Sequence, residues 1–217
     1  MKLPPNAKTS DVSLICIVDD DLMVRESIRM LCVAHDYQAC AYADCQSFLD
    51  APERAQCACL ILDVRLPGIS GPELQERLLA DTPPERIPPI IFISGHGTLP
   101  LAVKAMRLGA LDFLQKPFND GDLLERVAQA VEKTRQAQAV QREKSALAER
   151  LNHLSPREKE VLDALEAGLG NKQIADQMGI SIRTVEQHRA NLKAKLKSRN
   201  LPDLLKKART GTGAPDE

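Results

Sequence analysis

The stretch LICIVDD at residues 14–20 is a short apolar run that ends in two carboxylates. Three further apolar runs in the first half of the chain also end on polar residues that suit phosphoryl transfer. They read LILD at 60–63, IIFIS at 90–94 and LDFLQKP at 111–117. In an open parallel α/β sheet, ligands bind just beyond the carboxyl ends of the strands. We therefore predict one sheet edge that holds three carboxylates, a hydroxyl and an ammonium.

Strand-like runs alternate with helical patterns through the first half of the chain. A fifth strand is expected near 38–42, and the predicted helices span 23–35, 44–50, 72–79, 99–108 and 120–134. Such alternation implies parallel βαβ units. The predicted fold class is an α/β doubly wound sheet of five parallel strands, followed by a long linker helix and an all-α domain.

Composition and charge describe a globular chain with two unlike parts. The 217 residues are 43% hydrophobic and 27% charged. No apolar run approaches the roughly 20 residues of a membrane span, and the first residues lack the apolar core of a secretory signal, so we expect a cytoplasmic protein with no membrane partner. Residues 1–118 hold 11 basic and 15 acidic residues, whereas 151–217 hold 12 and 9. This asymmetry indicates a metal or phosphate site followed by a polyanion-binding module.

All six cysteines fall within the first 60 residues. Cys57 and Cys59 would point to the same face if they lie in a strand, and could form half of a metal or redox site. No second pair or His cluster has zinc-ligand spacing, however. We favour the interpretation that the thiols are reduced and pack as small hydrophobes.

The last third of the chain is helical by its sequence pattern. Residues 120–152 are rich in strong helix formers and lack proline, and the long helix they predict could form a coiled-coil seam or remain a solvated linker. Ser155 and Glu158 predict the capping box of a new helix, and Pro156 suits its first position. Two later helices joined by the turn at 179–181 make a helix-turn-helix.

The last predicted helix, capped by Ser181, turns its apolar stripe inward and its polar residues outward. Such a helix fits the major groove of double-stranded DNA. The candidates for base edges are Glu186, Gln187 and Asn191. Contacts with phosphate position a domain without reading sequence, and the candidates for them are Lys172, Arg183, Thr184, His188, Arg189 and Lys193. The alternative is a solvated helix in a small bundle.

The polar residues of the first half form a coherent phosphoryl-transfer set. A hard cation such as Mg²⁺ (or Mn²⁺) needs oxygen ligands. At a strand end, one of Asp19 and Asp20 can bind the cation directly while the other acts through water. Asp63 would be the nucleophile, with the cation screening its repulsion from phosphoryl oxygens. Lys116 offers a point charge to the phosphoryl group, and Ser94 offers a hydroxyl donor.

The motifs resemble those of a known family. VDDD at 18–21, LDVRLPG at 62–68, ISG at 93–95 and FLQKPF at 113–118 resemble a response-regulator receiver domain, a resemblance that covers roughly 13–134. The segment from LSPRE at 154–158 to TVEQHRAN at 184–191 resembles a LuxR-type helix-turn-helix. The pairing is most similar to the FixJ subfamily of two-component transcription factors.

The resemblance implies roles for the residues of the pocket. Asp63 is the implied phosphoacceptor and Asp20 a direct Mg²⁺ ligand, with Asp19 acting through water. The backbone carbonyl of Arg65 is a further implied ligand. Arg65 and His96 occupy positions that the family uses to set the lifetime of the phosphoryl group.

Further residues are implied to carry the switch. Ser94 and Phe113 match the hydroxyl and the aromatic residue that change position on phosphorylation. Lys116 matches the family's invariant cation, and the bond before Pro117 is usually cis in this fold. In FixJ-type relatives the face around 99–114 forms a dimer, so the candidate interface residues are Ala102, Val103 and Met106.

The implied function is a phosphorylation-dependent, DNA-binding transcriptional regulator of a two-component system. A sensor histidine kinase would donate the phosphoryl group, and the chain would catalyse only its own phosphorylation and dephosphorylation. Dimers formed on phosphorylation would bind promoter DNA and recruit RNA polymerase, with activation the commoner role in the family. The implied domains are a flexible tail at 1–12, a receiver at 13–134, a linker helix at 135–152, a DNA-binding domain at 153–209 and a disordered tail at 210–217.

Two other functions are open at this point. A HAD-like, Mg²⁺-dependent phosphohydrolase also uses an aspartyl nucleophile, and its D-x-D signature would map onto 19–23. Met23 fails the last position of that signature, and the basic terminal module would have no explanation. A DNA-binding protein that needs no phosphorylation is the other alternative.

Overall fold

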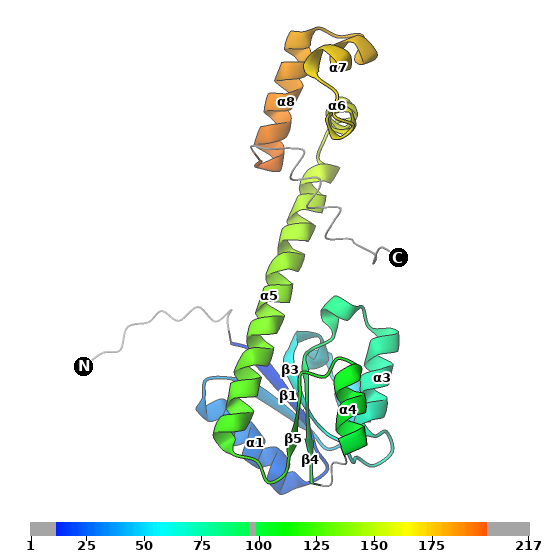
Figure 1. Ribbon diagram of the computed structural model, residues 1–217. Coiled ribbons are helices and arrows are strands. Elements are labelled where there is room, and N and C mark those ends of the chain that lie inside the picture. The colour runs from blue at the N-terminus through cyan, green and yellow to red at the C-terminus, as the bar shows by residue number, and fades with distance from the viewer. Residues whose placement is uncertain (1–11, 96–98, 199–217) are drawn as a thin grey trace, which may run out of the picture. The chain divides into compact units, whose positions relative to one another are not determined.

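The computed structural model describes residues 12–95 and 99–198 of the chain (Figure 1). The predictions for His96, for almost all of the tail at 1–12 and for the tail at 210–217 lie outside these residues. The chain divides into two compact units between Gln138 and Ala139, and each unit is described by itself. The finer domain boundaries expected from the sequence stay predictions. No helix in the described ranges is long and apolar enough to cross a membrane.

The first unit is built on a five-stranded parallel sheet, which confirms the predicted fold class. The strands are β1 (Leu14–Val18), β2 (Gln38–Tyr42), β3 (Cys57–Asp63), β4 (Ile90–Ser94) and β5 (Asp112–Gln115). Their order in the sheet is β2-β1-β3-β4-β5, and every neighbouring pair is parallel. The chain therefore winds first to one side of β1 and then to the other, so the carboxyl ends of β1 and β3 meet at the centre of one edge.

Helices cover both faces of this sheet (Figure 1). They are α1 (Leu22–Ala34), α2 (Cys45–Asp50), α3 (Gly71–Asp81), α4 (Leu99–Arg107) and the long α5 (Asp120–Asn152), with short 3-10 turns η1 (Pro52–Gln56) and η2 (Pro84–Arg86). One core lies between the sheet and α2, α3 and α4, and contains Phe48, Leu74 and Phe92. The other lies between the sheet and α1 and α5, and contains Ile28 and Val127.

The expectation that Cys57 and Cys59 share a face is wrong. Leu14 of β1 pairs with Cys57, but the next residue, Ile15, pairs with Cys59, so Ala58 is an extra residue in β3. A bulge of this kind reverses the side-chain alternation for the residues beyond it. Cys57 consequently packs in the core under α2, α3 and α4, and Cys59 in the core under α1 and α5. All six cysteines are free thiols, as expected, and five are buried.

Gly71 brings α3 against the strand that ends in Asp63. The amide of Gly71 donates to the carbonyl of Val64 at 3.2 Å. A β-carbon at this position would clash with the carbonyl oxygen of Asp63 and would lie 3.1 Å from Cε1 of Phe92. Ser70 and Glu73 form a capping box that begins the helix at this point. Only glycine therefore allows α3 to start so close to the sheet edge.

The second unit is a bundle of short helices. After the end of α5 these are α6 (Pro156–Glu166), α7 (Asn171–Met178) and α8 (Ile182–Leu196). Gly179, at φ +65°, turns the chain between α7 and α8, and Ser181 caps α8 through the amide of Thr184. Val161, Ile174, Val185, Leu192 and Leu196 are buried in the core of this unit.

A buried carboxylate ties two of these helices together. Glu158 of α6 is 4% exposed and accepts a hydrogen bond from Nζ of Lys195 on α8 at 2.7 Å. The same carboxylate accepts from the backbone amide of Ser155 at 2.8 Å, as the capping box predicts. The hydrogen bond from Lys195, followed by that from Ser155, lowers the pKa of Glu158.

Gly71→Ala should destabilise the first unit by about 1–3 kcal/mol, because the added methyl group forces α3 away from the strand. Urea unfolding followed by circular dichroism measures this change. Gly121→Ala in the first turn of α5 is the matched control, since the nearest described atom that the added methyl meets, apart from its chain neighbours and the backbone of α5 itself, is the end of the Asn119 side chain. Equal stability of the two variants would contradict the close approach.

Glu158→Gln should lower the unfolding free energy of the second unit by about 1 kcal/mol at neutral pH, because glutamine keeps the capping box and loses the ion pair. The depressed folded pKa means that the carboxylate stabilises the fold above its unfolded pKa of about 4.3 and loses this effect as pH falls through the folded value. Urea unfolding from pH 7 to pH 3 should therefore show the two proteins converging in acid. A difference that is constant over this range would refute the role of the charge.

Candidate phosphoryl site and DNA-binding face

Three predicted residues meet at the carboxyl edge of the sheet. Asp19 follows β1 directly, Asp63 is the last residue of β3, and Lys116 follows β5. Nζ of Lys116 donates to Oδ2 of Asp19 at 2.6 Å and to Oδ1 of Asp63 at 2.7 Å. The side chains of Asp19 and Asp63 are 0% and 8% exposed, and that of Lys116 is 20% exposed. A single ammonium thus lies between two buried carboxylates.

Backbone amides satisfy the remaining carboxylate oxygens. Oδ1 of Asp19 accepts from the amide of Asp21 at 2.9 Å, and Oδ2 of Asp63 accepts from the amide of Arg65 at 2.7 Å. Every oxygen of the two carboxylates therefore has a donor, which fixes the orientation of both groups. Hydrogen bonds to charged groups in a partly dry site are stronger than neutral ones.

The electrostatics of this cluster follow from its burial. Burial raises the pKa of Asp19, and hydrogen bonds from Lys116 and Asp21 only partly oppose that effect. Burial alone would lower the pKa of Lys116, but its hydrogen bonds to Asp19 and Asp63 raise that pKa above its ordinary value. The raised pKa of Lys116 favours its charged ammonium form. The raised pKa of Asp19 means that burial disfavours the ionised form of this carboxylate.

The other predicted pocket residues lie around this cluster. Asp20 and Arg65 have exposed side chains. Ser94, the last residue of β4, is 2% exposed, and its carbonyl accepts from the amide of Lys116 at 2.8 Å. The ring of Phe113 stacks on that of Phe92 with centroids 6.3 Å apart.

Two further expectations concern the loop after β5 and the surface of α4. The bond between Lys116 and Pro117 is cis, as the resemblance implies. Val103 and Met106 are exposed on α4, and Ala102 is half-buried beside them.

The donor chemistry of this edge fits a hard divalent cation. Carboxylate and carbonyl oxygens are the ligands that Mg²⁺ prefers, and two buried carboxylates share only one ammonium here. In residues 12–95 and 99–198, no three His, Cys, Asp or Glu side chains are grouped so that they could hold a metal ion. The carboxylates of Asp19 and Asp63, which would otherwise face the divalent cation, form ion pairs with Lys116.

A groove that the sequence did not predict adjoins Lys116. It has a volume of about 620 Å³ and lies between α1 and the segment that follows β5. Its lining residues include Met23, Ser27, Leu31, Pro117 and Phe118. Met23 is strongly exposed, and this apolar residue two positions after the acidic run at 19–21 was the sequence signal that could have revealed this surface.

Most of the predicted DNA-binding residues are exposed on α7 and α8, as a nucleic-acid interface requires. The exposed ones are Lys172, Arg183, Thr184, Glu186, Gln187, Asn191 and Lys193. Nε2 of Gln187 donates to Oδ1 of Asn191 at 3.1 Å, one helical turn away. This hydrogen bond does not use Oε1 of Gln187 or the amide nitrogen of Asn191, and such a pair of acceptor and donor suits the edge of a base.

Two predicted phosphate contacts lie deeper in the unit. His188 and Arg189 are half-buried. Nη1 of Arg189 donates to Oδ1 of Asn171 at 2.6 Å, which connects α8 to the first residue of α7. This hydrogen bond holds together the two helices of the helix-turn-helix, so Arg189 has an internal partner that sequence spacing did not indicate.

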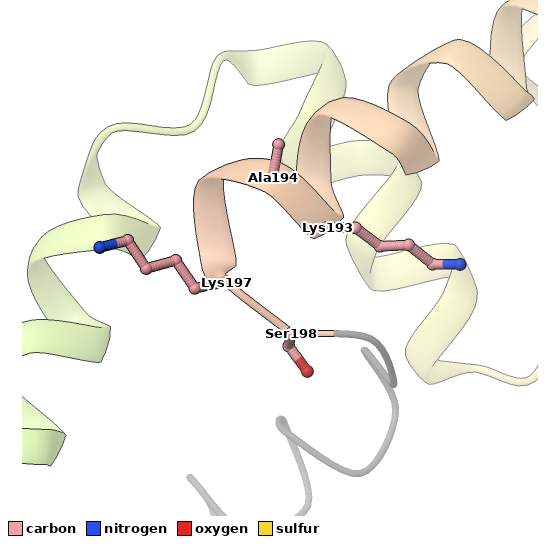
Figure 2. A pocket seen from close by; sticks show the side chains of 4 residues that line it. All are labelled: Lys193, Ala194, Lys197 and Ser198. Atoms are coloured by element: carbon pink, nitrogen blue, oxygen red, sulfur yellow. The ribbon is translucent and has the colours of Figure 1, made fainter.

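Basic side chains also border a hollow at the carboxyl end of α8 (Figure 2). It has a volume of about 590 Å³ and is lined by Lys193, Ala194, Lys197 and Ser198. Figure 2 shows Lys193 and Lys197 extending in opposite directions from the helix. Lys197 is exposed and extends the set of cations beyond those expected from the sequence.

Comparison with known proteins gives two family matches. Residues 15–128 match the response regulator receiver domain, and residues 152–208 match the luxR family of bacterial regulatory proteins. The chain is 40% identical over 194 residues to the transcriptional regulatory protein FixJ of Bradyrhizobium diazoefficiens, covering 89% of this chain and 93% of that one. It is 41% identical over 190 residues to the C4-dicarboxylate transport transcriptional regulatory protein DctR of Rhodobacter capsulatus, covering 87% and 95%.

Solved structures agree with these matches. The response regulator StyR is 37% identical, with a TM-score of 0.79 over 90% of this chain and 99% of that one. Full-length FixJ from B. japonicum is 38% identical, with a TM-score of 0.53 over 91% and 98%.

Arg189→Met should lower the unfolding free energy of the second unit by about 1 kcal/mol, because it removes the hydrogen bond to Asn171. Asn171→Ala should have a similar effect, and the double variant should be no less stable than the worse single one. Urea unfolding of the four proteins measures this coupling.

Lys172→Met is the control for this pair, because Lys172 is an exposed cation beside Asn171. It should leave stability unchanged and reduce the salt dependence of DNA binding by about one counterion. Unchanged stability of Arg189→Met, together with a reduced salt dependence of its DNA binding, would mean that Arg189 contacts phosphate and not Asn171.

Proposed function

The chain belongs to the response regulators that join a receiver domain to a LuxR-type DNA-binding domain, and from this we propose that phosphorylation of Asp63 controls its binding to DNA. The observation that carries the proposal is the position of Lys116 Nζ, within 2.7 Å of both Asp19 and Asp63. The family implies a histidine kinase as phosphodonor and double-stranded promoter DNA as target. The similar proteins FixJ and DctR are named as transcriptional regulatory proteins, which supports the same function.

Burial supports Asp63, among the acidic residues of the pocket, as the acceptor. Asp19 is fully buried, so a phosphoryl donor has no access to its oxygens. Asp20 is exposed but has no ammonium beside it among the contacts described. Asp63 combines a partly accessible carboxylate with an ammonium held charged by its neighbours. Its carboxylate oxygen would attack phosphorus, while Lys116 neutralises the developing negative charge.

A divalent cation completes this site in our proposal. Asp20, Asp63 and the carbonyl of Arg65 would hold Mg²⁺ (or Mn²⁺), with Asp19 acting through water, and the cation would supply charge neutralisation for the phosphoryl oxygens. The chain's own residues orient the acceptor: the amide of Arg65 fixes Oδ2 of Asp63 at 2.7 Å. The chain acts only on its own phosphoryl group, through its transfer from the donor and its later hydrolysis.

The phosphoryl group would act on the neighbouring strands through its charge. It adds about two negative charges at the sheet edge. The Ser94 hydroxyl, buried at the end of β4, would turn toward it as a donor. Phe113, half-buried on β5 and stacked on Phe92, would follow into the space that Ser94 leaves. The exposed side chains of Val103 and Met106, with Ala102, would then form the interface of a homodimer.

The dimer would bind paired half-sites in promoter DNA. In each protomer α8 would enter the major groove, with Gln187, Asn191 and Glu186 nearest the bases. The exposed cations of α7 and α8 would contact phosphate. RNA polymerase is the proposed partner at the promoter, and the cytoplasm is where we expect the chain to meet DNA.

The phosphohydrolase alternative is weakened by the local geometry. Its signature needs the acidic side chain two residues after the nucleophile, here Asp21, as an acid or base. Oδ1 of Asp21 instead accepts from the amides of Met23 and Val24 and caps α1. Asp19, which would be the nucleophile, is fully buried.

Asp63→Asn should abolish the response of DNA binding to phosphorylation, because an amide cannot accept the phosphoryl group. Duplexes selected from a random pool would be used in a gel-shift assay, with and without acetyl phosphate and Mg²⁺. Wild type should bind about tenfold tighter or better after treatment, since a dimer engages two half-sites at once.

Asp36→Asn is the matched control, because this exposed aspartate lies in the turn between α1 and β2 at φ 63°, a conformation that asparagine tolerates. It should respond as wild type does. Equal DNA binding by treated and untreated wild type would favour a protein that needs no phosphorylation. A response that survives in Asp63→Asn would place the acceptor elsewhere.

A further inference from the structure

Gln75 is a buried polar residue that the phosphoryl site does not use. It lies on α3 and is 1% exposed. The other buried polar or charged residues described are Asp19, Asp63 and Ser94 of the phosphoryl pocket and Glu158 of the second unit. A buried amide must be hydrogen bonded or it destabilises the fold, so its partners are informative.

The amide of Gln75 holds the carboxyl end of α4. Nε2 donates to the carbonyl of Ala105 at 3.2 Å and to that of Leu108 at 3.3 Å. The last carbonyls of a helix have no partner within the helix, so Gln75 supplies a cap from a neighbouring element. Gly109 ends the helix at this point with φ +89°, and the amide of Ala110 also bonds to Ala105.

The other polar atom of this side chain is left over. Oε1 of Gln75 is buried and has no hydrogen-bond partner within the described part of the chain. An unsatisfied buried acceptor opposes the arrangement in which it is trapped. The unsatisfied Oε1 therefore offsets part of the stabilisation that the two hydrogen bonds of Nε2 give to the end of α4.

Gln75 also lies one helical turn from the contact between α3 and the phosphoacceptor. Gly71 and Gln75 are four residues apart and so share one face of α3. Gly71 packs against the backbone of Asp63, and Gln75 holds the end of α4. The described contacts thus run from the Asp63 backbone through a single turn of α3 to the helix that carries Val103 and Met106.

We propose that Gln75 is a positioning residue that holds α4 in its unphosphorylated arrangement and so opposes dimerisation until Asp63 is phosphorylated. This inference rests on the proposed function. Without the clamp, α4 reaches the dimer-forming arrangement more easily, because two hydrogen bonds no longer favour the alternative. Gln75 touches neither Asp63 nor Lys116 among the contacts described, so its loss leaves the transfer chemistry intact.

Gln75→Met tests this role, because methionine is similar in size and length and has no donor for the carbonyls of α4. Sedimentation equilibrium of the full chain, with and without beryllofluoride and Mg²⁺, gives the dimer dissociation constants. We expect the constant of the untreated variant to fall about tenfold, and that of the treated variant to match treated wild type. The rate of phosphorylation by acetyl phosphate should equal that of wild type.

Glu76→Gln is the matched control on the same two helices. Glu76 forms an ion pair with Lys104 of α4 at 2.8 Å, with both side chains about half exposed. Such a surface pair contributes little, so its loss should leave both dissociation constants unchanged. A purely structural role for Gln75 would lower the unfolding free energy and leave the ratio of treated to untreated constants at the wild-type value, which would overturn the proposal.

A second measurement covers the case in which Gln75→Met does not fold. Amide hydrogen exchange of wild type at 108–110 should speed up severalfold when beryllofluoride and Mg²⁺ are added, because release of the clamp loosens this turn. If the protein dimerises with unchanged amide exchange at 108–110, the proposed role of Gln75 is overturned and the proposed function is not. A wild-type chain that neither dimerises nor takes up a phosphoryl group would overturn the proposed function together with this inference.

Discussion

The ammonium of Lys116 between the carboxylates of Asp19 and Asp63 is the interaction on which the rest of the receiver unit depends. Parallel strands bring the two carboxylates to the same edge, where burial penalises their charges and their mutual repulsion opposes folding. The Lys116 ammonium, at 2.6 Å from Asp19 and 2.7 Å from Asp63, offsets both the cost of burial and the repulsion between the carboxylates. The same charge balance makes the site sensitive to any new anion, since one ammonium has no surplus charge for a phosphoryl group. Structure and switching thus have a common electrostatic origin.

The link from this edge to the rest of the unit is short. Gly71 lets α3 begin against the Asp63 backbone, and Gln75, one turn later, reaches the end of α4. A second route starts at the same edge with Ser94, the last residue of β4, and continues to Phe113 in the neighbouring strand β5. β5 contacts α4, so these two routes meet at α4, whose outer surface carries the proposed dimer contacts. A change of charge at Asp63 therefore acts on packed elements that border one surface.

The sequence predicts the fold and the charged pocket because both depend on local patterns. An apolar run that ends in an aspartate gives the strand and the sheet edge together, and parallel topology then brings Asp19, Asp63 and Lys116 into contact. The features it misses depend on single residues whose effect is not local. The extra residue Ala58 in β3 has no signal of its own, yet it moves Cys57 and Cys59 to opposite faces. The hydrogen bonds of Gln75 to α4 and of Arg189 to Asn171 join residues 18 to 33 positions apart, a separation that helical periodicity does not address.

The most direct test of this account locates the phosphoryl group chemically. The chain would be treated with acetyl phosphate and Mg²⁺ and then reduced with borohydride, which converts an aspartyl phosphate to homoserine. Peptide mass spectrometry then reads the position of the new residue. Homoserine is expected at Asp63 and at no other position. Homoserine at Asp19 or Asp20, or a phosphorylated chain without homoserine at Asp63, would contradict it.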